Sequence, residues 1–588
     1  MTMGHNIYRK GEISMTKKII ITISLCFLTA IFFLLSSCSR LSPDYDLIIT
    51  KAQIVDGTGN PAYSSDVGIK GDTIVAIGDL SSKQATRKID AHNLVVAPGF
   101  IDVHTHCDGG LGKVDSNANL NYLIQGTTTV VTGNCGSGTF KIAETKAKWE
   151  NLGIGTNAIH LVGFGDVRQA VMGRDTRPAT PEEVEKMKAI VRQAMKEGAW
   201  GLSTGLEYIP DRYSTTEEII ELAKVVAEFG GVYASHQRNE FDQVPEATKE
   251  TIRIAKEAGL HAEISHLKIC RKNYWGGMKE VVALINKARS EGIHITADMY
   301  PYNMAGGGPV IDIVRNSGWS PFRLPPDLQP FADLRLKLRN KALSKPERAE
   351  LKKQYLNELK KALSDKSKRE LIKKYVIEGT PENPSPVAIG GWDSFVVATA
   401  KKNAHLIGKI ISDLAQEKKR DAFDIVAELA LAEHDMYVAC GVMSEEDMKL
   451  AIKQEWLMFC SDGDAIPIIK EGAKPKYGHP RAFSSQARVL RKYVREDKLL
   501  TLEEAIRKMT SLPASFLGLK DRGQIKEGYK ADIVIFDPKT IRDKATFADC
   551  QKYATGTKYV IVNGKLSIEE GKYHGALNGK MLLLTNNK

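Results

Sequence analysis

The apolar positions near the two ends of the chain follow a strand-like pattern. Short apolar runs are separated by turns rich in Gly and Asp, and the clearest runs are Tyr45–Gly57, Val67–Gly78, Ala531–Phe536 and Tyr559–Gly564. None of them carries a helical period, and such runs are typical of short β-strands. We therefore expect residues 44–97 and 517–575 to combine into one small β-domain.

In the middle of the chain, apolar strands alternate with amphipathic helices. Helical spacing marks the segments Pro181–Gly198, Thr215–Phe229, Pro245–Ala258 and Met278–Glu291. The predicted strands are Ala97–His106, Thr127–Thr132, Ala158–Phe164, Gly201–Thr204, Gly231–His236, His261–His266, Ile293–Asp298 and Trp456–Ser461. Eight strands joined mostly by helices predict the α/β class. We expect a TIM-like (β/α)8 barrel over residues 98–516, beside a small β-sandwich built from both chain ends.

Residues 315–389 do not fit this alternation. The stretch Leu334–Val376 is rich in Lys, Arg and Glu at helical spacing, which predicts a helical insertion into the barrel. Its charged residues are typical of a solvated helix face. A lid over the barrel mouth is the other interpretation that the pattern allows.

Composition narrows the function classes. The chain has 588 residues, a net charge of +11 and a pI of about 9.0, with 43% hydrophobic and 26% charged residues. These are ordinary fractions for a globular protein. Much of the basic excess lies in the predicted insertion and no nucleic-acid motif is present, so we expect no nucleic-acid partner. Eight cysteines without a CxxC pair exclude a disulfide scaffold.

The first 38 residues have the pattern of an export signal. Lys17 and Lys18 precede an apolar run from Ile19 to Leu35, and small residues follow it. The sequence Leu-Ser-Ser-Cys that ends at Cys38 resembles the lipobox of bacterial lipoproteins. That resemblance implies a signal peptide over residues 1–38 and lipid attachment at Cys38. An uncleaved membrane anchor is the alternative.

This signal predicts an exported lipoprotein that is anchored to a membrane. Ser39 stands where an aspartate often retains lipoproteins at the inner membrane, so we expect the periplasm and the outer membrane. Residues 1–14 add nothing to the signal. Translation could therefore begin at Met1 or at Met15.

Candidate chemistry gathers where the predicted strands end. In an α/β barrel the functional side chains lie at the carboxyl ends of the strands. At or just after those ends stand His104, His106, Cys135, His236, His266 and Asp462. Taken singly, Cys135 reads as a buried thiol, His236 as a core histidine and Asp462 as a turn residue. As a set they form the mixture of nitrogen, sulfur and oxygen donors that zinc accepts.

Across residues 45–570 the chain resembles the N-acyl-D-amino-acid deacylases (D-aminoacylases) of the amidohydrolase superfamily. The motifs that carry the resemblance are APGFIDVHTH, GTTTVVTGNCG, GLSTGLEYIP, YASHQRNE, ISHLK, YPY, CSDG, HPRAF, MTSLPA, DRGQIKEGYKADIVIFD and VNG. GNCG is the most specific, since most binuclear relatives bridge their metals with a carboxylated lysine. The fourth predicted strand ends without a lysine, which argues against a hydantoinase or a dihydroorotase.

The resemblance implies a metal centre. Cys135, His236 and His266 would hold one tightly bound Zn²⁺. A second, weaker position would be formed by His104, His106 and Asp462, with the Cys135 thiolate between the two.

The resemblance also implies a reaction. Water activated by the metal would attack the amide carbonyl of an N-acyl-D-amino acid, with Asp462 as general base and then general acid. The products would be a carboxylate and a free D-amino acid. Lys268 and Arg481 match the residues that bind the α-carboxylate, and Tyr300 and Tyr208 match tyrosines near the substrate. The D configuration rests on the resemblance alone.

One departure and two alternatives stay open. After the motif YPY, the stretch Asn303–Gly308 lacks the serine that the family often has there, so the side-chain preference is undetermined. A related amidohydrolase acting on D-containing dipeptides or cyclic imides fits the same residues. From another class, a surface-anchored binding lipoprotein on an inactive enzyme scaffold is the alternative, and the intact set of six donors argues against it.

Overall fold

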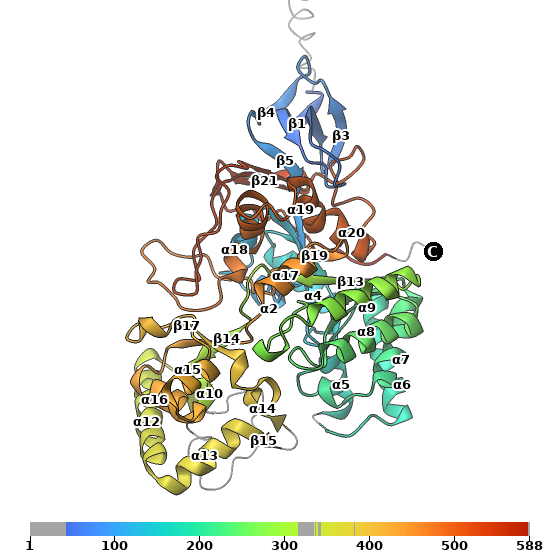
Figure 1. Ribbon diagram of the computed structural model, residues 1–588. Coiled ribbons are helices and arrows are strands. Elements are labelled where there is room, and N and C mark those ends of the chain that lie inside the picture. Colours follow the sequence, from blue (N-terminus) through green and yellow to red (C-terminus); the bar gives the residue numbers. More distant parts are fainter. Residues whose placement is uncertain are drawn as a thin grey trace, which may run out of the picture.

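The computed structural model describes residues 43–585, except 174, 315–333, 335–336, 339–342 and 381–382. The predicted signal over residues 1–38, including Cys38, therefore lies outside the described residues. Figure 1 shows three parts: a β-domain that joins the two ends of the chain, a central barrel, and an inserted unit beside the barrel. Among the described helices, none has the length and apolar character needed to cross a bilayer.

The barrel is made of parallel strands. They are β6 (Phe100–Asp102), β7 (Thr127–Thr132), β8 (Asn157–His160), β9 (Val162–Gly163), β10 (Gly201–Gly205), β11 (Val232–His236), β12 (His261–Ile264), β13 (Ile295–Met299) and β19 (Leu457–Phe459). They pair as β6-β7-β8 and as β9-β10-β11-β12-β13-β19, and only Leu161 separates β8 from β9. Beyond β19 the ring closes: the Asp462 amide donates to the His104 carbonyl (2.9 Å) and the His106 amide to the Gly463 carbonyl (2.8 Å). The predicted α/β barrel is confirmed.

Helices cover the outside of the barrel (Figure 1). Those between β7 and β13 are α4 (Ile142–Leu152), α5 (Phe164–Met172), α6 (Pro181–Lys196), α7 (Thr216–Glu228), α8 (Val244–Ala258) and α9 (Met278–Ser290). The start of α6 is fixed locally: the Thr180 side chain accepts from the Glu183 amide, and Glu183 accepts from the Thr180 amide. Each helix then buries one apolar stripe against the strands, for example Ile219, Leu222 and Val226 of α7.

One glycine lets the chain pass from the β-domain into the barrel. The predicted strand Ala97–His106 is in fact two elements, β5 (Val95–Pro98) in the β-domain and β6 in the barrel, with Gly99 between them. A Cβ atom on Gly99 would lie 2.3 Å from side-chain atoms of Thr128. Because only glycine allows this approach, the chain can change sheets here and carry the two histidines past the end of β6.

The β-domain unites both ends of the chain in one sheet. Its order is β23-β22-β21-β20-β5-β1-β2-β3, with β4 paired to β1. The bounds are β1 (Tyr45–Ile54), β2 (Tyr63–Lys70), β3 (Thr73–Gly78), β4 (Ala85–Asp90), β20 (Ile533–Phe536), β21 (Thr557–Val562), β22 (Lys565–Glu569) and β23 (Lys572–Tyr573). Antiparallel pairing of β20 with β5 joins the late strands to the early ones. The pairing of early and late strands predicted from the sequence is therefore present.

Between β13 and β19 the chain leaves the barrel and forms the inserted unit, residues 307–440. Its elements are β14 (Gly307–Pro309), α10 (Val310–Val314), α12 (Lys345–Ser364), α13 (Lys366–Glu378), β15 (Gly379–Thr380), β16 (Asn383–Pro384), α14 (Pro386–Gly390), β17 (Phe395–Thr399), α15 (Ile411–Lys418), α16 (Ala422–Ala432) and β18 (Tyr437–Cys440). The unit has its own buried cluster, whose members run from Val310 to Val438 and so extend to both sides of the predicted insertion at 315–389. Leu359 of α12 and Ile372 of α13 lie in this cluster, while most lysines of the two helices are exposed or half-buried.

Candidate active site

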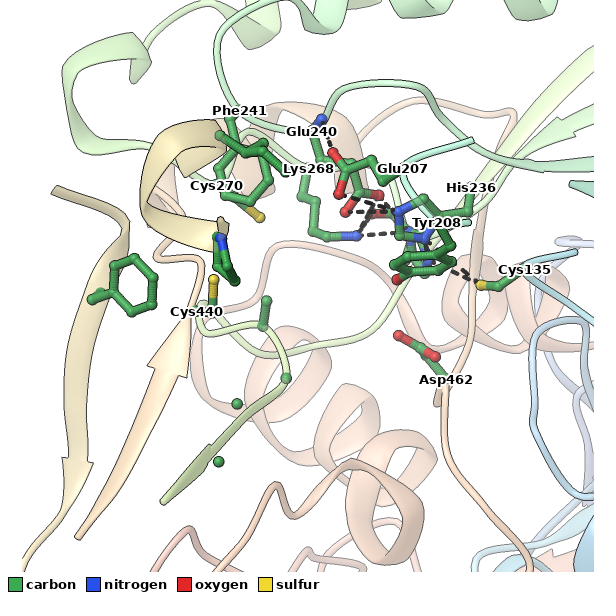
Figure 2. A pocket seen from close by; sticks show the side chains of 18 of the residues that line it. Cys135, Glu207, Tyr208, His236, Glu240, Phe241, Lys268, Cys270, Cys440 and Asp462 are labelled. Carbon is green, nitrogen blue, oxygen red and sulfur yellow. Dashed lines mark hydrogen bonds and ion pairs between the residues drawn. The ribbon is translucent and has the colours of Figure 1, made fainter. Parts of the chain in front are cut away.

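The six predicted metal ligands lie together at the carboxyl ends of the barrel strands. The Cys135 Sγ is 3.4 Å from His104 Nε2 and 3.5 Å from His266 Nε2. It is also 3.7 Å from His236 Nδ1, which is itself 3.0 Å from His266 Nε2. Figure 2 shows Cys135, His236 and Asp462 facing the same space. Residues from five different strand ends, those of β6, β7, β11, β12 and β19, therefore meet around one point.

Two donor groups share the sulfur. One is Cys135, His236 and His266, the other is His104, His106 and Cys135, and in each group the donor atoms lie within 4.8 Å of one another. Asp462 Oδ1 adds a carboxylate, 3.1 Å from His106 Nε2 and 3.7 Å from His104 Nε2. Thiolate, imidazole and carboxylate at this spacing fit zinc, which all three donor types bind.

Three of these residues have a left-handed backbone. The φ angles are 54° at Cys135, 38° at His266 and 51° at Asp462. Non-glycine residues rarely adopt this region, and the cost is of order 1–3 kcal/mol each. The turns after β7, β12 and β19 are thus held in the conformation that directs these side chains inward.

A carboxylate lies behind each of three imidazoles. Asp298 Oδ2 is 3.3 Å from His104 Nδ1, and Glu240 Oε1 is 2.8 Å from His266 Nδ1. On the third, Glu207 Oε2 is 3.5 Å from His236 Nε2. In each case the other ring nitrogen faces the cluster, which is the arrangement that orients metal-binding histidines.

No role was predicted from the sequence for these three carboxylates. Asp298 lies in β13, Glu207 follows β10 and Glu240 follows β11. Each is at or near a strand end, and Glu207 and Glu240 lie inside motifs quoted above. Their position near strand ends could have indicated a role in the site. Which histidine each carboxylate contacts depends on the fold.

The electrostatics of the cluster favour ionised donors. Burial alone would raise the pKa of the Cys135 thiol, but the positive imidazole of His104 and the hydrogen bonds from His104, His106 and His236 together lower that pKa well below its ordinary value. Burial likewise opposes ionisation of Asp462, yet the Arg481 guanidinium and His106 hold the pKa of its carboxyl well below the usual range. Thiolate and carboxylate are the forms that bind a metal.

A cavity of about 620 Å³ opens from this cluster. The four predicted substrate-binding residues, Lys268, Arg481, Tyr300 and Tyr208, all line it. Arg481, the first residue of α18 (Arg481–Arg488), places Nη1 2.5 Å from Asp462 Oδ2. The Lys268 ammonium is 2.6 Å from Glu240 Oε1, so both cations already face a carboxylate.

The two tyrosines lie at different points of the wall. The Tyr208 ring packs against His236, with centroids 4.4 Å apart. Tyr300 is buried, its ring lies beneath Arg481 at 5.1 Å, and its hydroxyl has no hydrogen-bond partner among the described residues. Tyr300 therefore offers a free donor to a molecule in the cavity.

The opposite wall of the cavity is apolar and comes mostly from the inserted unit. Its side chains are Phe241, Ile313, Val376, Pro386, Val387, Ile389, Phe395 and Val438. Only Phe241 belongs to the barrel. Figure 2 shows the strands of the inserted unit facing the polar cluster across this space.

Comparison with known proteins gives a consistent set of relatives. The model of the Amidohydrolase family matches residues 87–306 and 471–568. The D-aminoacylase of Alcaligenes xylosoxydans xylosoxydans is 31% identical over 568 residues, covering 92% of this chain and 99% of that protein. The N-acyl-D-glutamate deacylase of the same organism is 30% identical over 541 residues, covering 88% of this chain and 93% of that protein. Its N-acyl-D-aspartate deacylase is 30% identical over 562 residues, with 90% and 93% covered.

Two solved structures share the architecture. A crystal structure of D-aminoacylase superposes with a TM-score of 0.67 at 29% identity, covering 92% of this chain and 100% of that one. The N-acyl-D-glutamate deacylase of Bordetella bronchiseptica, solved with zinc and a phosphonate inhibitor, gives 0.67 at 27% identity, with 92% and 99% covered.

Proposed function

Because the chain belongs to the amidohydrolase family, we propose that it hydrolyses the amide bond of N-acyl-D-amino acids to a carboxylic acid and a free D-amino acid. The near full-length similarity to three deacylases of such compounds supports this substrate class. The observation that carries the proposal is the meeting of Cys135, His236 and His266 within coordination range at the floor of a cavity.

We propose zinc as the cofactor. Cys135, His236 and His266 would hold the tightly bound ion, and His104, His106 and Asp462 would form the weaker position. A zinc ion at this place supplies Lewis acidity, which lowers the pKa of water and polarises a carbonyl. The carboxylates of Glu240 and Glu207 keep the histidine rings turned toward it.

Asp462 is the proposed proton carrier. Its carboxylate lies between the histidine cluster and the cavity, and its low pKa keeps it ionised and ready to accept a proton from the attacking water. It would then deliver that proton to the leaving nitrogen, so that base and acid are the same group in succession.

The substrate carboxylate would bind between Arg481 and Tyr300. A guanidinium and a free phenol hydroxyl provide charge and directed hydrogen bonds for a carboxylate. The Lys268 ammonium, paired with Glu240, lies 5.9 Å from the Tyr300 ring centroid and would add positive potential near the same carboxylate. With the α-carboxylate bound there, the side chain of the amino acid would contact the apolar wall of the cavity.

The apolar wall leads us to propose bulky apolar D-amino acids as substrates. The lining supplied by the inserted unit has no Lys or Arg among its described residues, so a side-chain carboxylate would lose water without gaining a partner. N-acetyl-D-leucine should therefore be a better substrate than N-acetyl-D-glutamate.

Turnover of enantiomeric pairs tests the function. Purified, zinc-loaded protein is given N-acetyl-D-leucine, N-acetyl-L-leucine, D-containing dipeptides and cyclic imides, and released amine is measured. We expect turnover of the D-leucine derivative with little of its enantiomer. Turnover of the dipeptides or the imides alone would support the alternative function. No turnover of any compound, in a protein that binds no zinc, would favour a binding protein.

We also propose that the chain is exported and anchored to a membrane through lipid on Cys38. The support is the basic, apolar and Leu-Ser-Ser-Cys order of residues 17–38. Labelling of cells with a radioactive fatty acid should mark the wild-type protein. It should not mark a Cys38→Ala variant, and label on that variant would contradict the assignment.

A further inference from the structure

Among the described residues, one cation of the cavity wall has no charged partner. Lys268, Arg481 and Arg212 are the lysines and arginines that line the cavity in the described part of the chain. The first two contact Glu240 and Asp462. The Arg212 guanidinium has no ion pair and no hydrogen bond with any described residue, and the side chain is only partly exposed. The remaining lining carboxylate, Glu207, lies against His236 instead.

The backbone of Arg212 is firmly placed. Its amide donates to the Tyr208 carbonyl at 2.8 Å, one turn back. Its carbonyl accepts from Arg238 Nη1 at 3.0 Å, and Arg238 is in turn held by Glu250. The buried Asp211 carboxylate accepts from the Gly205 amide at 2.8 Å and fixes the turn to the end of β10. An arginine whose guanidinium contacts no other described residue therefore stands on a hydrogen-bonded turn, and it lines the same cavity as Cys135 and His236.

Arg212 and Arg481 lie on opposite sides of the barrel mouth. Arg212 follows β10, the fourth strand of the ring, and Arg481 follows β19, the eighth. In a ring of eight strands the fourth and the eighth face each other. The donor cluster lies between them, since Cys135 and His236 come from the intervening strands and Asp462 contacts Arg481. A substrate with its α-carboxylate at Arg481 and its amide over the cluster would extend its acyl group toward Arg212.

We propose that Arg212 binds an anionic acyl group, so that the preferred substrates are N-acyl-D-amino acids whose acyl chain ends in a carboxylate. This inference rests on the proposed function and specifies the acyl side of its substrate. A guanidinium can hold a carboxylate through two parallel hydrogen bonds. In the hydrolysis of N-succinyl-D-leucine the C–N bond breaks, water supplies hydroxyl to the acyl carbon and a proton to the nitrogen, and the products are succinate and D-leucine.

The test compares two acyl groups of nearly equal shape. N-succinyl-D-leucine carries a terminal carboxylate where N-succinamoyl-D-leucine carries a neutral amide. We expect wild-type kcat/KM to be about tenfold or more higher for the succinyl compound, as a hydrogen-bonded charge pair would give. Equal values for the two compounds in the wild-type protein would overturn the proposal without any variant being made.

Variants assign the preference to Arg212. In Arg212→Gln the ratio of the two kcat/KM values should fall toward one, and in Arg212→Lys it should be intermediate. Arg192→Gln removes the same charge from helix α6, outside the cavity lining, and should keep the wild-type ratio. A full preference retained by a folded Arg212→Gln protein would overturn the assignment.

Failure of the proposed function would be recognised separately. N-acetyl-D-leucine, which lacks the anionic acyl group, is assayed beside the pair, so loss of all turnover counts against the hydrolase and not against Arg212. In that event calorimetric binding of the two compounds to zinc-loaded protein decides. Tighter binding of the succinyl compound supports the anion site, and equal binding overturns it.

Discussion

The two walls of the cavity differ in origin and in character. The barrel wall is formed by strand ends and carries buried histidines, a cysteine, carboxylates and three residues with left-handed backbone. The wall of the inserted unit is formed by short helices and strands and carries apolar side chains. The barrel thus provides the reactive groups and the inserted unit shapes the space in front of them. Reaction type and substrate preference should therefore respond to different substitutions.

The largest effect is expected on the barrel side, at the sulfur shared by both donor groups. Cys135→Ala should lose tightly bound zinc and lower kcat by at least about a thousandfold, since metal-activated water supplies the nucleophile. Zinc per chain by plasma emission spectrometry and turnover of N-acetyl-D-leucine measure both. Cys550→Ala removes another buried thiol, one that neither lines the cavity nor belongs to the donor groups, and should change neither. Full zinc content in Cys135→Ala would mean that the sulfur is no ligand.

The next effect separates metal binding from proton transfer. Asp462→Asn should lower kcat by about 10² to 10⁴, the range for loss of a general acid–base, while one zinc per chain remains on Cys135, His236 and His266. Asp464→Asn, an exposed neighbour, serves as the matched control. A variant at position 462 with near wild-type kcat would remove Asp462 from the mechanism.

A smaller effect is expected on the wall of the inserted unit. Ile389→Ala shortens a lining side chain and should lower kcat/KM for N-acetyl-D-leucine by about tenfold, the value of a few methylene contacts. The loss should be much smaller for N-acetyl-D-alanine, which does not reach that wall. Ile407→Ala, at an exposed isoleucine of the same unit, should leave both unchanged. Equal losses on both substrates would show that the wall does not select the side chain.

The last prediction concerns His261, at the amino end of a barrel strand, where a substitution should change stability and have the smallest effect on activity. Burial and the neighbouring His294 lower the pKa of His261 to about 4. Between pH 4 and 6.5 the unfolded chain then binds more protons than the folded one, so stability falls as the pH drops through this window. The loss between pH 7 and 5 should be about 2 kcal/mol.

Urea unfolding at pH 7 and at pH 5 measures this difference in the free energy of unfolding. His261→Gln should reduce the pH dependence, whereas substitution of the exposed His92 by Gln should not. An unchanged pH dependence in His261→Gln would contradict the assignment to His261.

The contrast between the walls also explains what the sequence could predict. The predicted amidohydrolase family, hydrolase class and α/β barrel are confirmed. They could be predicted because donor residues at the ends of strands can be recognised in the local sequence. The split of Ala97–His106 at Gly99 was missed, since it depends on the approach of Thr128. The contacts of Asp298 and Glu240 with particular histidines arise from strand order, and the residues themselves do not specify them.

The apolar wall of the cavity could not be predicted from the sequence, for a physical reason. In the sequence, the helices of the insertion are dominated by exposed lysines and glutamates. Some of their buried residues contact both the core of the inserted unit and the cavity. Val376, for example, belongs to the cluster of the inserted unit and also lines the cavity. Periodicity predicts that such a residue is buried, but not that one of its neighbours is a substrate.

In the proposed metal centre, side chains far apart in the sequence hold one zinc ion at the barrel mouth. X-ray absorption at the zinc edge of the purified wild-type protein measures this directly. We expect one sulfur neighbour of the zinc at about 2.3 Å together with nitrogen neighbours at about 2.0 Å. Zinc surrounded by nitrogen and oxygen alone, or a protein that retains no zinc, would contradict it.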